Sequence, residues 1–168
     1  DWSAMAAYTR RDYKELDNKG TVGGTGTART EPNPQDGRSD ALLGRIVYDP
    51  ANGHKLRLTG EYLDTSLFTE GLTGLSPTVE LLEARDTGQR KRVSLDWSWQ
   101  GEGAIDFARV ALYWQDGEDR QFTDEDRTPA VDRERLNTFE NRVFGASADA
   151  RADFATGAIT HRLVFGGD

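Results

Sequence analysis

Apolar and polar residues alternate with a period of two along seven segments of this chain. The segments cover residues 1–11, 42–49, 55–63, 92–100, 107–115, 142–154 and 159–167. In the fourth of them Val93, Leu95 and Trp97 alternate with serine and aspartate. Alternation of this kind is typical of β-strands, because successive side chains point to opposite faces of the sheet. The pattern predicts an all-β fold of about seven strands, arranged as an antiparallel up-and-down meander.

The connections between these segments alternate in length. Residues 50–53, 101–106 and 156–157 form short links, whereas residues 16–41, 64–91 and 116–142 form long ones. We therefore expect three long loops at one end of the meander and three short turns at the other. Outer-membrane barrels have long extracellular loops at one end and short periplasmic turns at the other. Within the second long loop, Ser76 before Pro77 predicts a short helix over residues 76–89.

The apolar faces carry aromatic residues near the ends of the segments. Tyr48 and Trp99 lie next to short turns, and Tyr62 and Trp114 lie towards the long loops. Aromatic bands that flank an aliphatic zone are typical of membrane interfaces. We expect one lipid-facing surface formed by Leu42, Ile46, Leu56, Leu58, Val93, Leu95, Val110 and Leu112. The alternative is a soluble β-sandwich that binds carbohydrate through stacking on Trp97, Trp99 and Trp114.

The polar faces carry charges that would point into a barrel. The residues expected to face the lumen or a plug are Arg45, Arg57, Glu61, Arg92, Asp96 and Arg109. Seven strands alone leave two edges with unpaired backbone groups, which lipid does not tolerate. We therefore expect further strands to complete the barrel, and self-association when the chain is isolated. Because the sequence opens within a strand and without an initiator Met, we interpret it as an internal segment of a longer protein.

Composition excludes several classes of function. The net charge of −8 argues against a nucleic-acid partner, and the absence of Cys excludes disulfides and thiolate metal sites. We predict no catalytic site, because the spacing of the residues suggests no catalytic triad.

The acidic segment 116–136 is rich in carboxylates but interleaved with arginines, so we expect a solvated loop and no metal site. His54 and His161 both lie beside short turns, and we expect them to be interfacial or solvated side chains.

Several stretches resemble the early barrel strands of TonB-dependent receptors. These stretches are YTRRDYKELDNKG, RTEPNPQDGRSDALLGRIVY, HKLRLTGEY and FGASADARADFATGAITHRLVFGGD. The branch that they resemble most is the haem/haemoglobin (haemoglobin, transferrin and lactoferrin) receptor group. The matching features are Glu15 and Asn18, the loop motif of residues 33–36, and the strand entry at Leu42 and Leu43.

The resemblance implies a bacterial outer-membrane barrel of about 22 strands with an N-terminal plug. This chain would supply roughly a third of that barrel, contacting lipid, the plug and the remaining strands. The full receptor would take up haem or another iron source, coupled to TonB and assisted by capture of a haem-carrying protein. We expect ligand or partner contacts at residues of the extracellular loops, namely Asn33, Gln35, Asp36, Glu83 and Arg85. The haem-binding motifs of that group are not found in this sequence, so we expect no cofactor bound by this chain.

Overall fold

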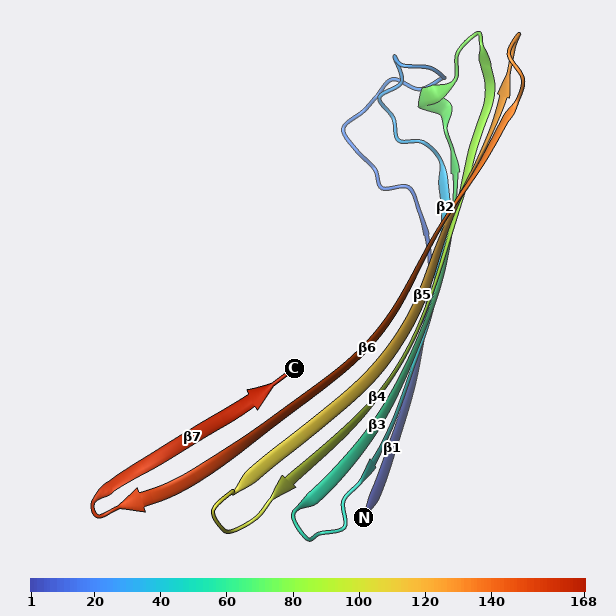
Figure 1. Cartoon of the computed structure of the whole chain (residues 1–168). Coiled ribbons are helices and arrows are strands. Elements are labelled where there is room, and N and C mark those ends of the chain that lie inside the picture. The colour runs from blue at the N-terminus through green and yellow to red at the C-terminus, as the bar shows by residue number, and fades with distance from the viewer.

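The computed structural model describes residues 1–168 and contains one seven-stranded sheet. The strands are β1 (Trp2–Lys14), β2 (Gln35–Tyr48), β3 (His54–Glu70), β4 (Val79–Gln100), β5 (Phe107–Arg127), β6 (Arg133–Thr156) and β7 (Ile159–Gly167). Each strand pairs antiparallel with its neighbours in the sequence, in the order β1 to β7 (Figure 1). The predicted all-β, up-and-down meander is therefore confirmed.

The register of the ladder confirms the predicted apolar face. Leu95 lies opposite Leu58 on one side and Leu112 on the other. One row further along, Trp97 lies opposite Leu56 and Val110. Directly opposed residues point to the same side of a sheet, so these side chains form one continuous surface. We call this side the outer face and the opposite side the inner face.

The predicted order of connections is correct, but the loops are much shorter than the sequence suggested. Residues 15–34, 71–78 and 128–132 connect strands at one end, and residues 49–53, 101–106 and 157–158 connect them at the other (Figure 1). Most of segments 64–91 and 116–142 is strand, because β3 to β6 continue well beyond the apolar zone. The first long loop also ends earlier than predicted, since β2 begins at Gln35. We call these continuations, together with the loop-end parts of β1 and β2, the polar extensions.

The helix predicted over residues 76–89 is not present. A short 3-10 turn, η1, covers Leu72–Gly74, and β4 begins at Val79. The hydroxyl of Ser76 accepts hydrogen bonds from the backbone N–H groups of Thr78 and Val79, at 3.2 and 3.1 Å. These bonds form a tight turn that leads into the strand. Pairing of β4 with both β3 and β5 then outweighs the local helical preference.

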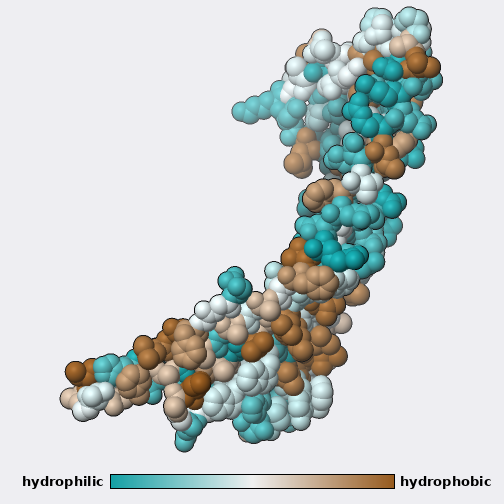
Figure 2. Space-filling view, viewed as in Figure 1, coloured by the Kyte–Doolittle hydropathy of each residue, from teal (hydrophilic) through white to brown (hydrophobic).

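The sheet is a single open layer without a hydrophobic core. No hydrophobic residue is buried, and many large apolar side chains of the outer face are exposed. Figure 2 shows hydrophobic residues gathered over the half that ends in the short turns, and hydrophilic residues over the other half. No helix in the structure has the length and apolar character needed to cross a membrane. One edge of β1 and one edge of β7 have no neighbouring strand.

Two tyrosines pack against glycines across the strands of the inner face. Tyr13 lies opposite Gly37, and Tyr113 lies opposite Gly145. A Cβ atom added to either glycine would come within 2.3 Å of the tyrosine ring. An aromatic ring that covers a cross-strand glycine shields the exposed backbone and fixes the register. These two pairs therefore help to define which residues point inward.

Candidate functional site

The outer face carries an apolar belt that spans all seven strands. It is formed by Trp2, Ala4, Ala6, Tyr8, Leu42, Gly44, Ile46, Tyr48, Leu56, Leu58, Gly60, Tyr62, Val93, Leu95, Trp97, Trp99, Ala108, Val110, Leu112, Trp114, the even positions 144–154, and Ile159, His161, Leu163 and Phe165. The belt contains no Asp, Glu, Lys or Arg. Leu58, Leu95 and Leu112 are each more than 40% exposed. An exposed apolar surface of this extent marks a region that contacts lipid or another apolar partner.

Aromatic side chains form the rim of the belt next to the short turns. The rings of Trp2 and Tyr48 stack with centroids 4.3 Å apart. Trp97 donates a hydrogen bond from Nε1 to Nδ1 of His54, over 3.2 Å, and the two rings stack. His161 stacks on Phe154, with centroids 4.9 Å apart. Both histidines thus lie at the short-turn end, as the sequence indicated, and pack against neighbouring aromatic rings.

A row of charges forms the opposite rim. On each of β1 to β6, the first outer-face residue beyond the belt is charged: Arg10, Asp40, Asp64, Lys91, Asp116 and Arg142. The belt tyrosines beside this row direct their hydroxyl groups to it. Tyr62 donates to Asp64 over 3.3 Å and accepts from Gln89 over 2.9 Å, and Tyr8 donates to Asp40. The apolar surface therefore ends along one row on β1 to β3 and one row nearer the short turns on β4 to β6, where Lys91 lies opposite Tyr62.

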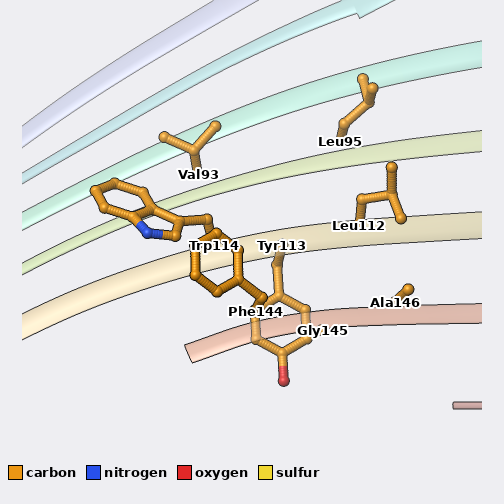
Figure 3. A pocket seen from close by; sticks show the side chains of 8 residues that line it. All are labelled: Val93, Leu95, Leu112, Tyr113, Trp114, Phe144, Gly145 and Ala146. Carbon is orange, nitrogen blue, oxygen red and sulfur yellow. The ribbon is translucent and has the colours of Figure 1, made fainter. Parts of the chain in front are cut away.

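A shallow hollow lies on the outer face beside this rim (Figure 3). It has a volume of about 580 Å³, and seven of its eight lining residues are hydrophobic. Trp114 and Phe144 lie opposite each other at one side, and the small side chain of Ala146 leaves space beside Leu112. Tyr113 points to the inner face, where it covers Gly145. The walls offer van der Waals contacts, which suit a hydrocarbon chain.

The inner face behind the belt is charged and internally paired. Asp96 accepts from Arg109 at 2.9 Å and lies 3.5 Å from Arg57. Arg92 lies 3.9 Å from Glu61. Nε of Arg45 is buried and has no hydrogen-bond partner. All six residues predicted to face a lumen or plug lie on this one face, as their register positions show.

The residues predicted as loop contacts fall into two groups. Asn33 and Gln35 are engaged within the chain. The side-chain amide of Asn33 donates to Oγ1 of Thr73 and accepts from its backbone N–H, both at 3.0 Å. The backbone N–H of Gln35 donates to Glu15 over 2.9 Å, which holds the pKa of this carboxyl below its ordinary value. The bonds of Asn33 attach the long loop to the η1 turn, and the side-chain amide of Gln35 donates to Oγ1 of Thr69 over 3.3 Å, so both side chains are engaged within the chain.

Asp36, Glu83 and Arg85 lie together on the outer face of the polar extensions. Asp36 is opposite Phe68, which is opposite Arg85. The Arg85 guanidinium lies 5.6 Å from the centre of the Phe68 ring and 3.6 Å from the Glu83 carboxylate. Phe68 is the member of this group that the sequence analysis missed, because it lies in a segment predicted as loop. The adjacent apolar residues Leu67 and Phe68 break the period of two, so the sequence offered no signal for this position.

The acidic segment 116–136 forms strand rather than loop for most of its length. Arg133 donates to both carboxylate oxygens of Glu125, at 2.5 and 2.7 Å, which lowers the pKa of Glu125. Partial burial and the nearby carboxylates of Asp132 and Asp124 raise the pKa of Asp126. No group of three or more His, Asp or Glu side chains is arranged to hold a metal ion.

No protein-family model matches the chain, and no curated protein matches its sequence significantly.

Proposed function

We propose that this chain forms a lipid-facing part of the wall of an outer-membrane β-barrel in a TonB-dependent receptor. The observation that carries the proposal is the apolar belt, which has aromatic residues at one rim and a row of charges at the other. A soluble sheet has no reason to end its apolar surface within one register row on six strands. A bilayer imposes this requirement, because charged groups are costly in the hydrocarbon region.

The height of the belt comes closest to that of a bilayer on β6. The belt covers seven residues on each of β1 to β5 and eleven residues (Phe144–Phe154) on β6. At about 3.3 Å per residue, this corresponds to ~23 Å and ~36 Å along the strand. With a strand tilt of about 45°, the belt spans ~16 Å of the bilayer on β1 to β5 and ~26 Å on β6. Barrels of the outer membrane have an apolar band of about 25 Å.

The inner face suits contact with a plug. Among the six predicted lumen residues, four arginines and two carboxylates give a charge of 4 − 2 = +2. The Nε of Arg45 on the same face is a buried donor without a partner in this chain. We expect an acidic surface of the plug to lie against this side. The receptor would then take up haem or another iron source, with the polar extensions and the loop 15–34 on the side where the cargo arrives.

The second candidate function is a soluble β-sandwich that binds carbohydrate on its tryptophans. All four tryptophans lie on the outer face, which supports either a lipid contact or a stacking surface. The two candidates differ in what surrounds the indole rings. In the barrel the rings contact acyl chains, whereas in the sandwich they contact water, sugar or a second sheet.

Quenching of tryptophan fluorescence in lipid vesicles tests the proposal. One variant retains Trp114 and has phenylalanine at the other three tryptophan positions. The matched variant moves this indole to the inner face by Trp114→Phe and Gln115→Trp. We expect lipids brominated on the acyl chains to quench the first variant strongly, and acrylamide to quench the second. Equal quenching of both variants by bromolipid, or quenching of the first by acrylamide alone, would contradict a lipid-facing belt.

A further inference from the structure

The polar extensions enclose a hollow on the inner face, beyond the charged rim of the belt. It has a volume of about 730 Å³ and is lined by Tyr13, Thr65, Ser66, Leu67, Asp86, Thr87, Gly88, Asp119, Arg120, Gln121, Asn137, Thr138 and Phe139. A second hollow of about 230 Å³ shares Thr65, Gly88, Asp119 and Phe139 with it and continues towards the belt. We call the two hollows together the inner groove. Its size is within the range of small-molecule sites.

Two glycines form the floor of the inner groove. Gly88 and Gly117 lie in adjacent strands and both point inward. A Cβ atom at Gly88 would approach Oδ1 of Asp119 to 2.7 Å and Oγ1 of Thr65 to 2.8 Å. At Gly117 the nearest atoms would be backbone oxygens at 3.7 and 3.9 Å. The missing side chains thus leave a depression, and at Gly88 a methyl group would displace the polar groups around it.

Four polar side chains of the groove are free. Asp86, Asp119, Gln121 and Asn137 make no hydrogen bond or ion pair with another side chain or with the backbone. On the outer face of the same strands several charges are paired, as in Arg142 with Asp116 and Arg120 with Glu118. The four free side chains all lie on the groove side.

Aromatic rings stand at the two sides of the groove. Tyr13 lies on β1 and covers Gly37. Phe139 lies on β6, is 64% exposed, and has no aromatic or cationic partner within the chain. An exposed ring between amides and carboxylates offers a flat apolar surface next to hydrogen-bonding groups. This combination suits a ligand that has both an apolar face and many hydroxyl groups.

We infer that the inner groove binds a neutral polyhydroxylated ligand of the oligosaccharide class. The amides of Gln121 and Asn137 can donate and accept, as sugar hydroxyls do. Asp86 and Asp119 accept from hydroxyl groups in charge-assisted hydrogen bonds. Phe139 packs against the C–H face of a sugar ring. The proposed iron-source role assigns no ligand to this surface, so the groove is an additional site on the side where cargo arrives.

The charges of the groove argue against ionic ligands. The carboxylates of Asp86 and Asp119 repel an anion. Arg90, which also lines the groove, places positive charge beside them, which disfavours a polycation. The remaining polar lining consists of uncharged amides and hydroxyls, which match hydroxyl groups better than they match an ion.

Calorimetric titration of the full chain in a sugar-free zwitterionic detergent tests the inference. The probes are maltohexaose and cellohexaose, with spermine and citrate as charged controls. We expect at least one oligosaccharide to bind and neither charged probe to compete. Binding of neither oligosaccharide, or displacement by spermine or citrate, would overturn the assignment.

Two exposed apolar residues of β6 provide matched variants. Phe139 points into the groove, whereas Leu136 is similarly exposed on the outer face. We expect Phe139→Ala to weaken oligosaccharide binding about 3- to 10-fold, and Leu136→Ala to leave it unchanged. Equal effects of both substitutions would refute the stacking role. Loss of bromolipid quenching with binding retained would instead contradict the lipid-facing belt, so the two proposals fail separately.

Discussion

Arginine substitutions at Ala148 and Ser147 separate a lipid-facing from a water-facing position on one strand. Both side chains are small and exposed, and they are adjacent in β6. Ala148 lies opposite Val110 in the middle of the belt, and Ser147 lies opposite Ala111 on the inner face. Any difference between the two variants therefore reports the environment of each face.

The expected loss of folding free energy depends on how deep the substituted residue lies in the bilayer. An arginine on the lipid face near the bilayer midplane destabilises a barrel by about 2–4 kcal/mol. Ala148→Arg should therefore lower the folding equilibrium constant about 30- to 900-fold. Ser147→Arg should change stability by less than about 0.5 kcal/mol, since the inner face is hydrated and already carries arginines.

Denaturant titration of the chain in lipid vesicles, with tryptophan fluorescence as the readout, measures the loss of folding free energy in both variants. The midpoint should fall for Ala148→Arg and remain close to the unmodified value for Ser147→Arg. Equal penalties, or a larger penalty for Ser147→Arg, would refute the assigned faces. Such an outcome would require a shift of the strand by one residue, which exchanges the two faces.

Four further outcomes follow from the structure. Asn33→Ala should release the loop 15–34 from the η1 turn, which faster amide hydrogen exchange across the loop would report. The ion pair of Glu125 with Arg133 stabilises the β5–β6 hairpin fully above pH ~4.5, the ordinary pKa of a glutamate carboxyl. This stabilisation should be lost as the pH falls through the lowered pKa of Glu125 in the folded state. NMR titration of the wild type and of Glu125→Gln measures the effect. His54→Ala removes the acceptor of the Trp97 indole, so the emission of Trp97 should shift, while Lys55→Ala should not change it. Without lipid or detergent, light scattering should show an assembly larger than a monomer, because the belt and two strand edges are uncovered.

The sequence predicted the fold wherever one face is apolar. Along residues 93–99 every second residue is Val, Leu or Trp, so both the strand and its orientation follow from the pattern alone. The six residues predicted to face a lumen share one face of the sheet for the same reason, since they occupy the alternate positions of those strands. Thr59 shows a limit of this reasoning. It occupies a polar position but is buried beside Arg45, its partner on β2, which the alternation could not reveal.

The polar extensions were missed because both of their faces are in contact with polar groups or water. In the stretch of residues 118–127, charged and amide side chains occupy both faces, so no period of two is visible. These residues are strand because β5 pairs there with β4 on one side and β6 on the other. Such pairing depends on segments distant in the sequence. The inner groove was therefore beyond reach, since it requires the register of β1, β3, β4, β5 and β6 together.

The register of the belt also determines the composition of the inner groove. Strands β3 to β6 continue through the charged rim, and beyond the rim their register is uninterrupted as far as the shift between Val79 and Leu81. If the belt contacts lipid as proposed, burial of its apolar side chains fixes which residues point outward. The same alternation then directs Asp119, Gln121 and Phe139 inward, although surface ion pairs in the extensions are each worth only about 0–1 kcal/mol. The proposed lipid contact would thereby specify the proposed binding groove without touching it.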